Sequence, residues 1–204
     1  MADQKTIGAF TETVTSLPPN KRYILTHDSS GTSIIHSSPS QLYHGRAGVG
    51  GMARSFSTSS VPAVLQDDAD VKSYLSEEGP TSHKDTSIVS TSGSGTGSNL
   101  LVVDIAPGGQ SQMHRTVSID YSICVIGHVR MELDCGKFID LYPGDHVIQR
   151  GTMHKWYNGS QTEPARFVAV TLPCEPFKIP GTEKMLKEEH VEGSGATQRD
   201  GSKL

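Results

Sequence analysis

Polar side chains that can transfer protons recur at every second position between residues 113 and 127. The row consists of His114, Thr116, Ser118, Asp120 and Ser122. Alternate residues of a β-strand point to the same side, so the row shares one face while mostly apolar residues share the other. The polar face has neither lysine nor glutamate, which a solvent-exposed row usually carries. We therefore expect it to line an internal cavity.

A second imidazole, His154, follows in the segment 142–158. Two histidines and one aspartate can act as acids and bases: one group removes a proton beside a carbonyl, and another protonates a leaving hydroxyl. The same groups could hold a divalent iron, zinc or manganese ion with open coordination positions. We predict His114, Asp120 and His154 as catalytic residues and, as an alternative, as metal ligands.

Neighbouring residues supply candidates for substrate binding. Thr116, Ser118 and Gln149 could hydrogen-bond a carbonyl or phenolic oxygen, and Arg150 could bind a carboxylate through two parallel hydrogen bonds. Trp156 shares parity with His154 and could form a flat wall for an aromatic or polyene ligand. Ordinary core packing is an equal alternative for this indole.

The rest of the chain predicts the elements that hold these groups. A hairpin is expected at 23–27 and 32–36, a loop at 46–62 and a short helix within 67–79. Short strands separated by turn signals follow residue 98, as in an all-β sandwich or barrel. We expect three divisions of the chain. Residues 1–98 form an arm, a hairpin and a loop that pack on the barrel, and residues 99–174 form the barrel core. Residues 175–204 form a short helix at 182–190 and a flexible tail.

Two blocks of this sequence resemble the paired motifs of the cupin superfamily. The first block offers Gly108 or Gly109, His114, Thr116, Asp120 and Gly127, and the second offers Gly144, Gln149, Arg150, Gly151, His154 and Asn158. The resemblance spans about 100–172, and the hairpin is similar to the N-terminal extension of small cupins from fungal secondary-metabolite clusters. It implies an RmlC-like double-stranded β-helix, or jelly-roll barrel, and it also implies a homodimer.

The departures from the cupin motifs bear on the metal. Metal-binding cupins usually use three histidines and a glutamate. This chain has Thr116 in place of one histidine and Asp120 in place of the glutamate, which leaves His114, Asp120 and His154 as the candidate ligand set.

Three functions remain open for this set of residues. The first is a lyase or isomerase that dehydrates or decarboxylates a small polyketide-like carbonyl compound, where the substrate class rests on family analogy. The second is a metal-dependent dioxygenase that uses the two histidines and the aspartate. The third is a non-catalytic ligand-binding cupin.

Composition limits partners and location. The net charge is −4 and charged residues make up 20% of the chain, so no electrostatic argument favours nucleic acid or an anionic membrane. No apolar run approaches the ~20 residues needed to span a bilayer. The three cysteines match no zinc pattern and are expected to be free thiols. The final Ser202, Lys203 and Leu204 match a peroxisomal import signal read by a receptor; without such import, the cytoplasm is expected.

Overall fold

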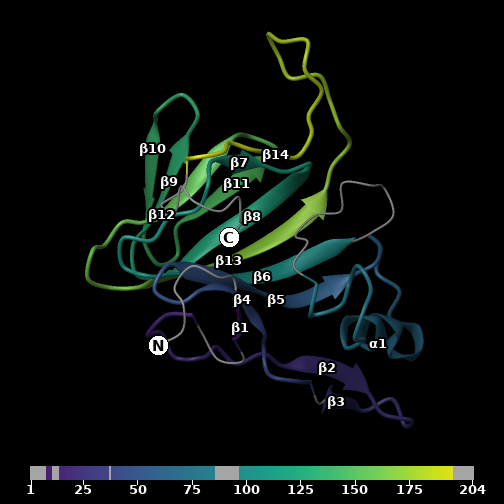
Figure 1. Cartoon of the computed structure of the whole chain (residues 1–204). Helices are drawn as coiled ribbons and strands as arrows, with labels where there is room; N and C mark the ends of the chain where they lie inside the picture. Colours follow the sequence, from purple (N-terminus) through teal and green to yellow (C-terminus); the bar gives the residue numbers. More distant parts are fainter. Residues whose placement is uncertain (1–7, 11–13, 37, 86–96, 195–204) are drawn as a thin grey trace.

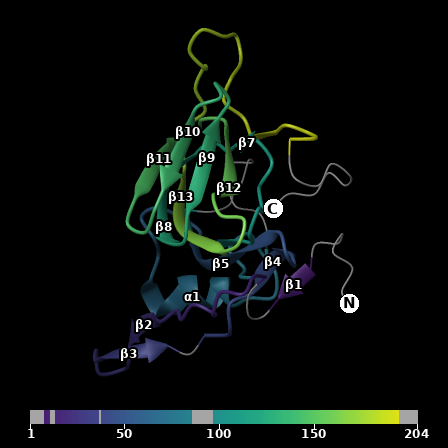
Figure 2. The same cartoon turned by 90° about the vertical axis from the view of Figure 1, so that its left-hand side faces the viewer.

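The computed structural model describes residues 8–10, 14–36, 38–85 and 97–194 as two antiparallel sheets that face each other (Figure 1). The larger sheet has the order β1-β4-β5-β6-β13-β8-β11, and the smaller has the order β10-β9-β12-β7-β14. Together they form the all-β jelly-roll barrel of the cupin fold that the sequence predicts. The hairpin β2–β3 and the helix α1 lie below the barrel in both views (Figures 1 and 2).

The elements have the following bounds. The larger sheet contains β1 (Gly8–Phe10), β4 (Tyr43–Arg46), β5 (Gly50–Thr58), β6 (Ser98–Ile105), β13 (Ala165–Pro173), β8 (Ser118–Ile126) and β11 (His146–Arg150). The smaller sheet contains β10 (Phe138–Leu141), β9 (Val129–Leu133), β12 (His154–Asn158), β7 (His114–Arg115) and β14 (Glu189–His190). Outside them lie β2 (Ile24–His27), β3 (Ser33–His36), the 3-10 turn η1 (Gln66–Asp68) and α1 (Ala69–Tyr74).

Alternation along β8 sets the direction of the polar row. Ser118, Asp120 and Ser122 are buried, whereas Tyr121 and Ile123 on the other face are exposed. The strand pairs with β13 on one side and β11 on the other, which fixes its register and therefore the face that each side chain occupies. The expectation that the polar row faces the interior is confirmed.

An apolar core closes the barrel around this row. The rings of Trp156 and Phe167 stack with centroids 4.5 Å apart, and Leu101, Ile105 and Met131 are almost fully buried nearby. Each such side chain contributes about 1.5–3 kcal/mol when it leaves water. These contacts give the polar row a rigid, apolar frame.

The N-terminal hairpin and the short helix form as predicted, but the loop expected at 46–62 is wrong. Most of that segment is β5, which pairs with β4 and β6 on its two sides. The glycines and serines of this segment favour a loop when only the local sequence is considered. Pairing along both edges of β5 overrides this weak local preference. Gly51 is required by space, because a Cβ there would lie 2.8 Å from the carbonyl oxygen of His44.

The N-terminal arm lies against the larger sheet. In its described part, Val14 and Leu17 are buried against the barrel. Arg166 and Asp104 form a buried ion pair there, 2.5 Å between Nε and Oδ1, and Arg166 also donates to the Pro18 carbonyl at 3.1 Å. The arm therefore covers the outer face of the larger sheet.

The helix predicted at 182–190 is wrong. The chain leaves the barrel after β13, makes an excursion that both views show, and returns as β14 along the edge strand β7 (Figures 1 and 2). The charged residues of this segment have helical propensity, but isolated helices as short as 182–190 are unstable without packing, and the strand edge offers backbone partners instead. The two-residue strand β14 thereby places His190 opposite His114.

Some predictions lie outside the described residues. These are the tail from residue 195 and, within it, the signal Ser202, Lys203 and Leu204. Cys124, Cys135 and Cys174 are free thiols, as expected. None of the helices in the described part of the chain has the length and apolar character needed to cross a membrane.

Candidate functional site

A cavity opens between the two sheets of the barrel. One part of its wall is apolar and comes from Gly51, Met52, Leu101, Val103, Ile105, Trp156, Phe167 and Ala169. The other part is polar and comes from Ser111, His114, Thr116, Asp120, Ser122, His154 and Thr171. A cavity with an apolar body and a few converging polar groups suits a small organic ligand.

Two histidines lie side by side on the smaller sheet at the cavity wall. His114 on β7 and His154 on β12 are directly paired across the strands, and their ring centroids are 4.3 Å apart. His154 is 3% exposed and His114 is half-buried. The strand pairing therefore brings together two groups that lie forty residues apart in the sequence.

Hydrogen bonds behind the rings constrain the protons. The carbonyl oxygen of Gln112 lies 2.8 Å from Nδ1 of His114 and can only accept, so Nδ1 carries the proton and the lone pair is on Nε2. Gln149 reaches both the Thr152 carbonyl and Nδ1 of His154, the latter at 2.5 Å. The Thr152 carbonyl also lies 3.0 Å from Nδ1 of His154, so this nitrogen contacts one donor, the Gln149 amide, and one acceptor, the Thr152 carbonyl.

These contacts fit two tautomers of His154: a proton on Nδ1 is donated to Thr152, whereas a proton on Nε2 leaves Nδ1 to accept from Gln149. Burial, and then the charge of His114, lower the pKa of His154 to about 3. A buried imidazolium without a counter-charge is costly, so the ring is neutral at physiological pH. In the tautomer whose Nδ1 accepts from Gln149, His154 offers an N–H beside the lone pair of His114, which is the pair that acid–base chemistry requires.

Asp120 lies on β8, in the opposite sheet. Its side chain is 8% exposed, and burial raises the pKa of its carboxyl to about 6, an effect that a hydrogen bond with Ser118 partly offsets. Ser118 also lies 2.7 Å, Oγ to Oγ1, from the hydroxyl of Thr116. Asp120 makes none of the described hydrogen bonds to the histidines, so it does not orient either imidazole.

The same residues do not assemble as metal ligands. Within the described residues, no three histidine, cysteine, aspartate or glutamate side chains are grouped so that they could hold one ion. The hydroxyl of Thr116, at the position of a usual cupin ligand, is engaged with Ser118. His114, Asp120 and His154 therefore do not form the ligand set that was the alternative prediction, and no step below depends on a metal.

The predicted substrate-binding residues separate into three groups. Thr116 and Trp156 line the cavity. Ser118 and Gln149 are buried behind the wall, where they hold Asp120 and His154. Arg150 is exposed, and its prediction as a ligand is wrong: Gln149 faces the interior, so the next residue of the strand faces solvent.

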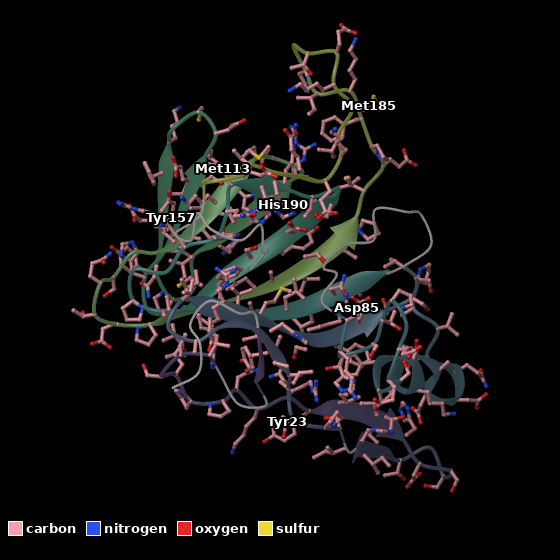
Figure 3. All side chains as sticks on the ribbon, viewed as in Figure 1. Tyr23, Asp85, Met113, Tyr157, Met185 and His190 are labelled. Atoms are coloured by element: carbon pink, nitrogen blue, oxygen red, sulfur yellow. The ribbon has the colours of Figure 1, made fainter. Side chains whose placement is uncertain are left out.

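Sequence reasoning missed several groups. Ser111, Ser122 and Thr171 add hydroxyls to the cavity wall, and only Ser122 was suggested by alternation. His190, the last residue of the helix predicted at 182–190, instead stacks on His114 with ring centroids 5.5 Å apart and an angle of 7°. It lies beside Met113 at the end of the barrel (Figure 3). The local sequence offers no signal for this contact, because β14 forms only by pairing with β7.

Comparison with curated proteins establishes the family. Phomopsin biosynthesis cluster protein C' of Diaporthe leptostromiformis is 37% identical over 171 residues, which cover 80% of this chain and 82% of that protein. The cupin-domain-containing oxidoreductase fogC of Aspergillus ruber is 33% identical over 164 residues, which cover 78% and 75%. The chain therefore belongs to the cupin superfamily, in a group with fungal biosynthetic-cluster proteins and enzymes.

Solved structures show more distant similarity. A protein with a double-stranded β-helix domain from Klebsiella pneumoniae aligns with 47% of this chain and 75% of its own, at 23% identity and a TM-score of 0.38. A cupin domain of a transcriptional regulator from Enterobacter cloacae aligns with 39% and 84%, at 24% identity and a TM-score of 0.34. No family model matches the sequence.

Proposed function

We propose that this cupin is a lyase or isomerase that acts on a small carbonyl compound inside the barrel, with dehydration as its first candidate reaction. The observation that carries the proposal is the pair of adjacent imidazoles on the cavity wall, with ring centroids 4.3 Å apart. In the proposed reactive state His114 presents a lone pair on Nε2, and His154, whose Nδ1 accepts from Gln149, presents a proton on Nε2.

The two rings divide the work of a dehydration. His114 removes the proton from the carbon next to the carbonyl and passes it to the leaving hydroxyl, while the Nε2–H of His154 hydrogen-bonds the carbonyl oxygen and stabilises the enolate. The C–H and C–O bonds break, a C=C bond forms, and water leaves. His114 has gained and then lost one proton and His154 keeps its own, so both rings end in their starting state. Positioned acid–base groups of this kind typically contribute ~10²–10⁴-fold each.

Oxidation is the second candidate, favoured by the names of relatives such as the oxidoreductase fogC. Such a reaction needs an electron acceptor in addition to the residues described here. Decarboxylation ranks below dehydration within the lyase proposal, because its substrate carries a carboxylate and the described lining of the cavity has Asp120 and no lysine or arginine. A purely ligand-binding cupin predicts the same cavity without turnover.

Metabolite comparison tests the proposal. Extracts of the source organism with and without the gene should differ in one accumulated compound, and purified wild-type protein should convert it. His154→Ala should lower the rate by ~10²-fold or more, because the hydrogen-bond donor that stabilises the enolate is lost. His146→Ala, at an exposed position of β11, is the matched control and should keep full activity. Equal conversion by His154→Ala and wild type would refute the proposed role of the histidine pair.

We further infer that the protein is a homodimer. The outer face of β8 and β11 exposes Tyr121, Ile123, Val125 and Ile148, and no described residue of this chain covers them. A contiguous apolar face of this kind is typical of an interface. Tyr121→Lys should yield a monomer in sedimentation-velocity experiments, whereas Phe138→Lys on β10 should not. A monomeric wild-type protein would contradict the inference.

A further inference from the structure

One oxygen of Asp120 has no partner. The carboxyl lies on the cavity wall and is more than nine-tenths buried, and its Oδ1 accepts no hydrogen bond in the described part of the chain. A buried acceptor that loses its water without gaining a donor costs about 1–3 kcal/mol, and more when it is charged. Buried polar groups of native proteins are nearly always satisfied, so this atom calls for a donor from outside the chain.

The surrounding residues do not provide that donor. Ser118 already interacts with the carboxyl, and its hydroxyl is also engaged with that of Thr116. The unpartnered oxygen therefore points to the ligand space of the cavity rather than to a missing side-chain contact.

The charge of the wall restricts which ligand fits. Among the described residues that line the cavity there is no lysine or arginine, and Asp120 is the only carboxylate. A ligand carboxylate or phosphate near Asp120 would meet a like charge in a desolvated site. A neutral hydroxyl can donate a charge-assisted hydrogen bond to Oδ1 instead.

The two polar groups stand on opposite walls. Asp120 belongs to the larger sheet and the histidine pair to the smaller sheet, with Leu101, Val103 and the Trp156–Phe167 stack among the residues that line the space. A ligand that contacts both groups must have polar ends on an apolar, flat body.

We propose that the substrate is an uncharged aromatic or polyene carbonyl compound that carries a hydroxyl group, which donates to Oδ1 of Asp120 while the carbonyl end faces His114 and His154. This assignment rests on the proposed function, because it names the substrate class of the same cavity. Asp120 is then a specificity-determining residue rather than a metal ligand or a general base.

Three related probes test the assignment: 4-hydroxyacetophenone, 4-methoxyacetophenone and 4-acetylbenzoate. Binding is measured by isothermal titration calorimetry, and quenching of Trp156, the only tryptophan of the chain, reports whether the probe enters the cavity. Wild-type protein should bind the hydroxyl probe on the order of tenfold or more tightly than the methoxy probe, because a hydrogen bond to a charged group is lost. The carboxylate probe should bind most weakly.

Variants separate the contact from a general effect. Asp120→Ala should remove the preference for hydroxyl over methoxy, and Asp120→Asn, which keeps the size of the side chain, should reduce it. Asp140→Asn on β10 should keep it in full. Equal binding of the hydroxyl and methoxy probes to wild type, or a preference that survives in Asp120→Ala, would overturn the assignment and leave the proposed function standing. Failure of all three probes to bind wild type or to quench Trp156 would contradict both.

Discussion

Replacing Asp120 with asparagine should stabilise the barrel at neutral pH and not at acidic pH. Burial raises the pKa of the Asp120 carboxyl from 3.8 to about 6, so the folded protein holds this proton more tightly than the unfolded chain. The stability that the neutral carboxyl gives is fully present below the unfolded pKa and is lost as the pH rises through about 6. The shift of about two pH units corresponds to about 3 kcal/mol.

The assay is urea unfolding of wild type and Asp120→Asn, with chelator present, at about pH 4 and about pH 8. The difference in unfolding free energy between the two proteins should move by about 3 kcal/mol in favour of the variant across this interval. Any loss from altered hydrogen bonding is present at both pH values and cancels in this comparison.

Asp140→Asn provides a control of opposite sign. A hydrogen bond from Arg130 lowers the pKa of the Asp140 carboxyl to about 2, and the group is largely exposed, so its variant should lose a little stability at neutral pH. For Asp120→Asn, the reasoning would be refuted if the difference in unfolding free energy from wild type did not change with pH, or if it moved in favour of wild type as the pH rises. It would mean that the carboxylate has a positive partner in the folded protein.

Three further outcomes follow from the site. Gln149→Leu removes the donor to Nδ1 of His154, so nitrogen NMR should show the ring proton moving from Nε2 to Nδ1. Turnover should fall by on the order of tenfold or more. An unchanged tautomer would contradict the proposed reactive state of His154. His190→Ala removes the ring stacked on His114, so the imidazole resonances of His114 should shift, and unshifted resonances would mean that the stack is absent in solution. Arg150→Ala should change probe affinity by less than about twofold, because the side chain faces solvent, and a larger loss would place it at the site after all.

Alternation and motif spacing were enough to predict the barrel and the face that carries the polar row. The pattern of β8 has a period of two and one buried side, which leaves a single register that keeps the apolar residues together. The hairpin β2–β3 and the turn between β9 and β10 were also predictable, because turn residues separate β-rich runs.

The parts that failed depend on contacts between distant segments. The strand β5 is rich in glycine and serine, and only its pairing with β4 and β6 makes it a strand. The two-residue strand β14 likewise exists only because β7 offers an open edge, so the stacking of His190 on His114 could not be read from the local sequence.

The position of each predicted site residue depended on parity and on the partner strand. Parity placed Asp120 at the cavity but could not show that it lies on the opposite sheet from the histidines. Gln149 was expected to touch substrate, yet it lies behind His154, where its amide contacts Nδ1 of the ring. Arg150, the next residue of the same strand, points to solvent. The sequence left the direction of its side chain ambiguous, because the strand ends there in a turn.

The mass difference between substrate and product, measured without oxygen and with a metal chelator present, tests the central claim most directly. The account predicts that wild-type protein still converts the accumulated compound, and that the product is an isomer or has lost the mass of water or of carbon dioxide. Conversion that stops under these conditions, or a product that has gained oxygen or lost hydrogen, would show that the histidine pair does not carry out the reaction by acid–base chemistry alone.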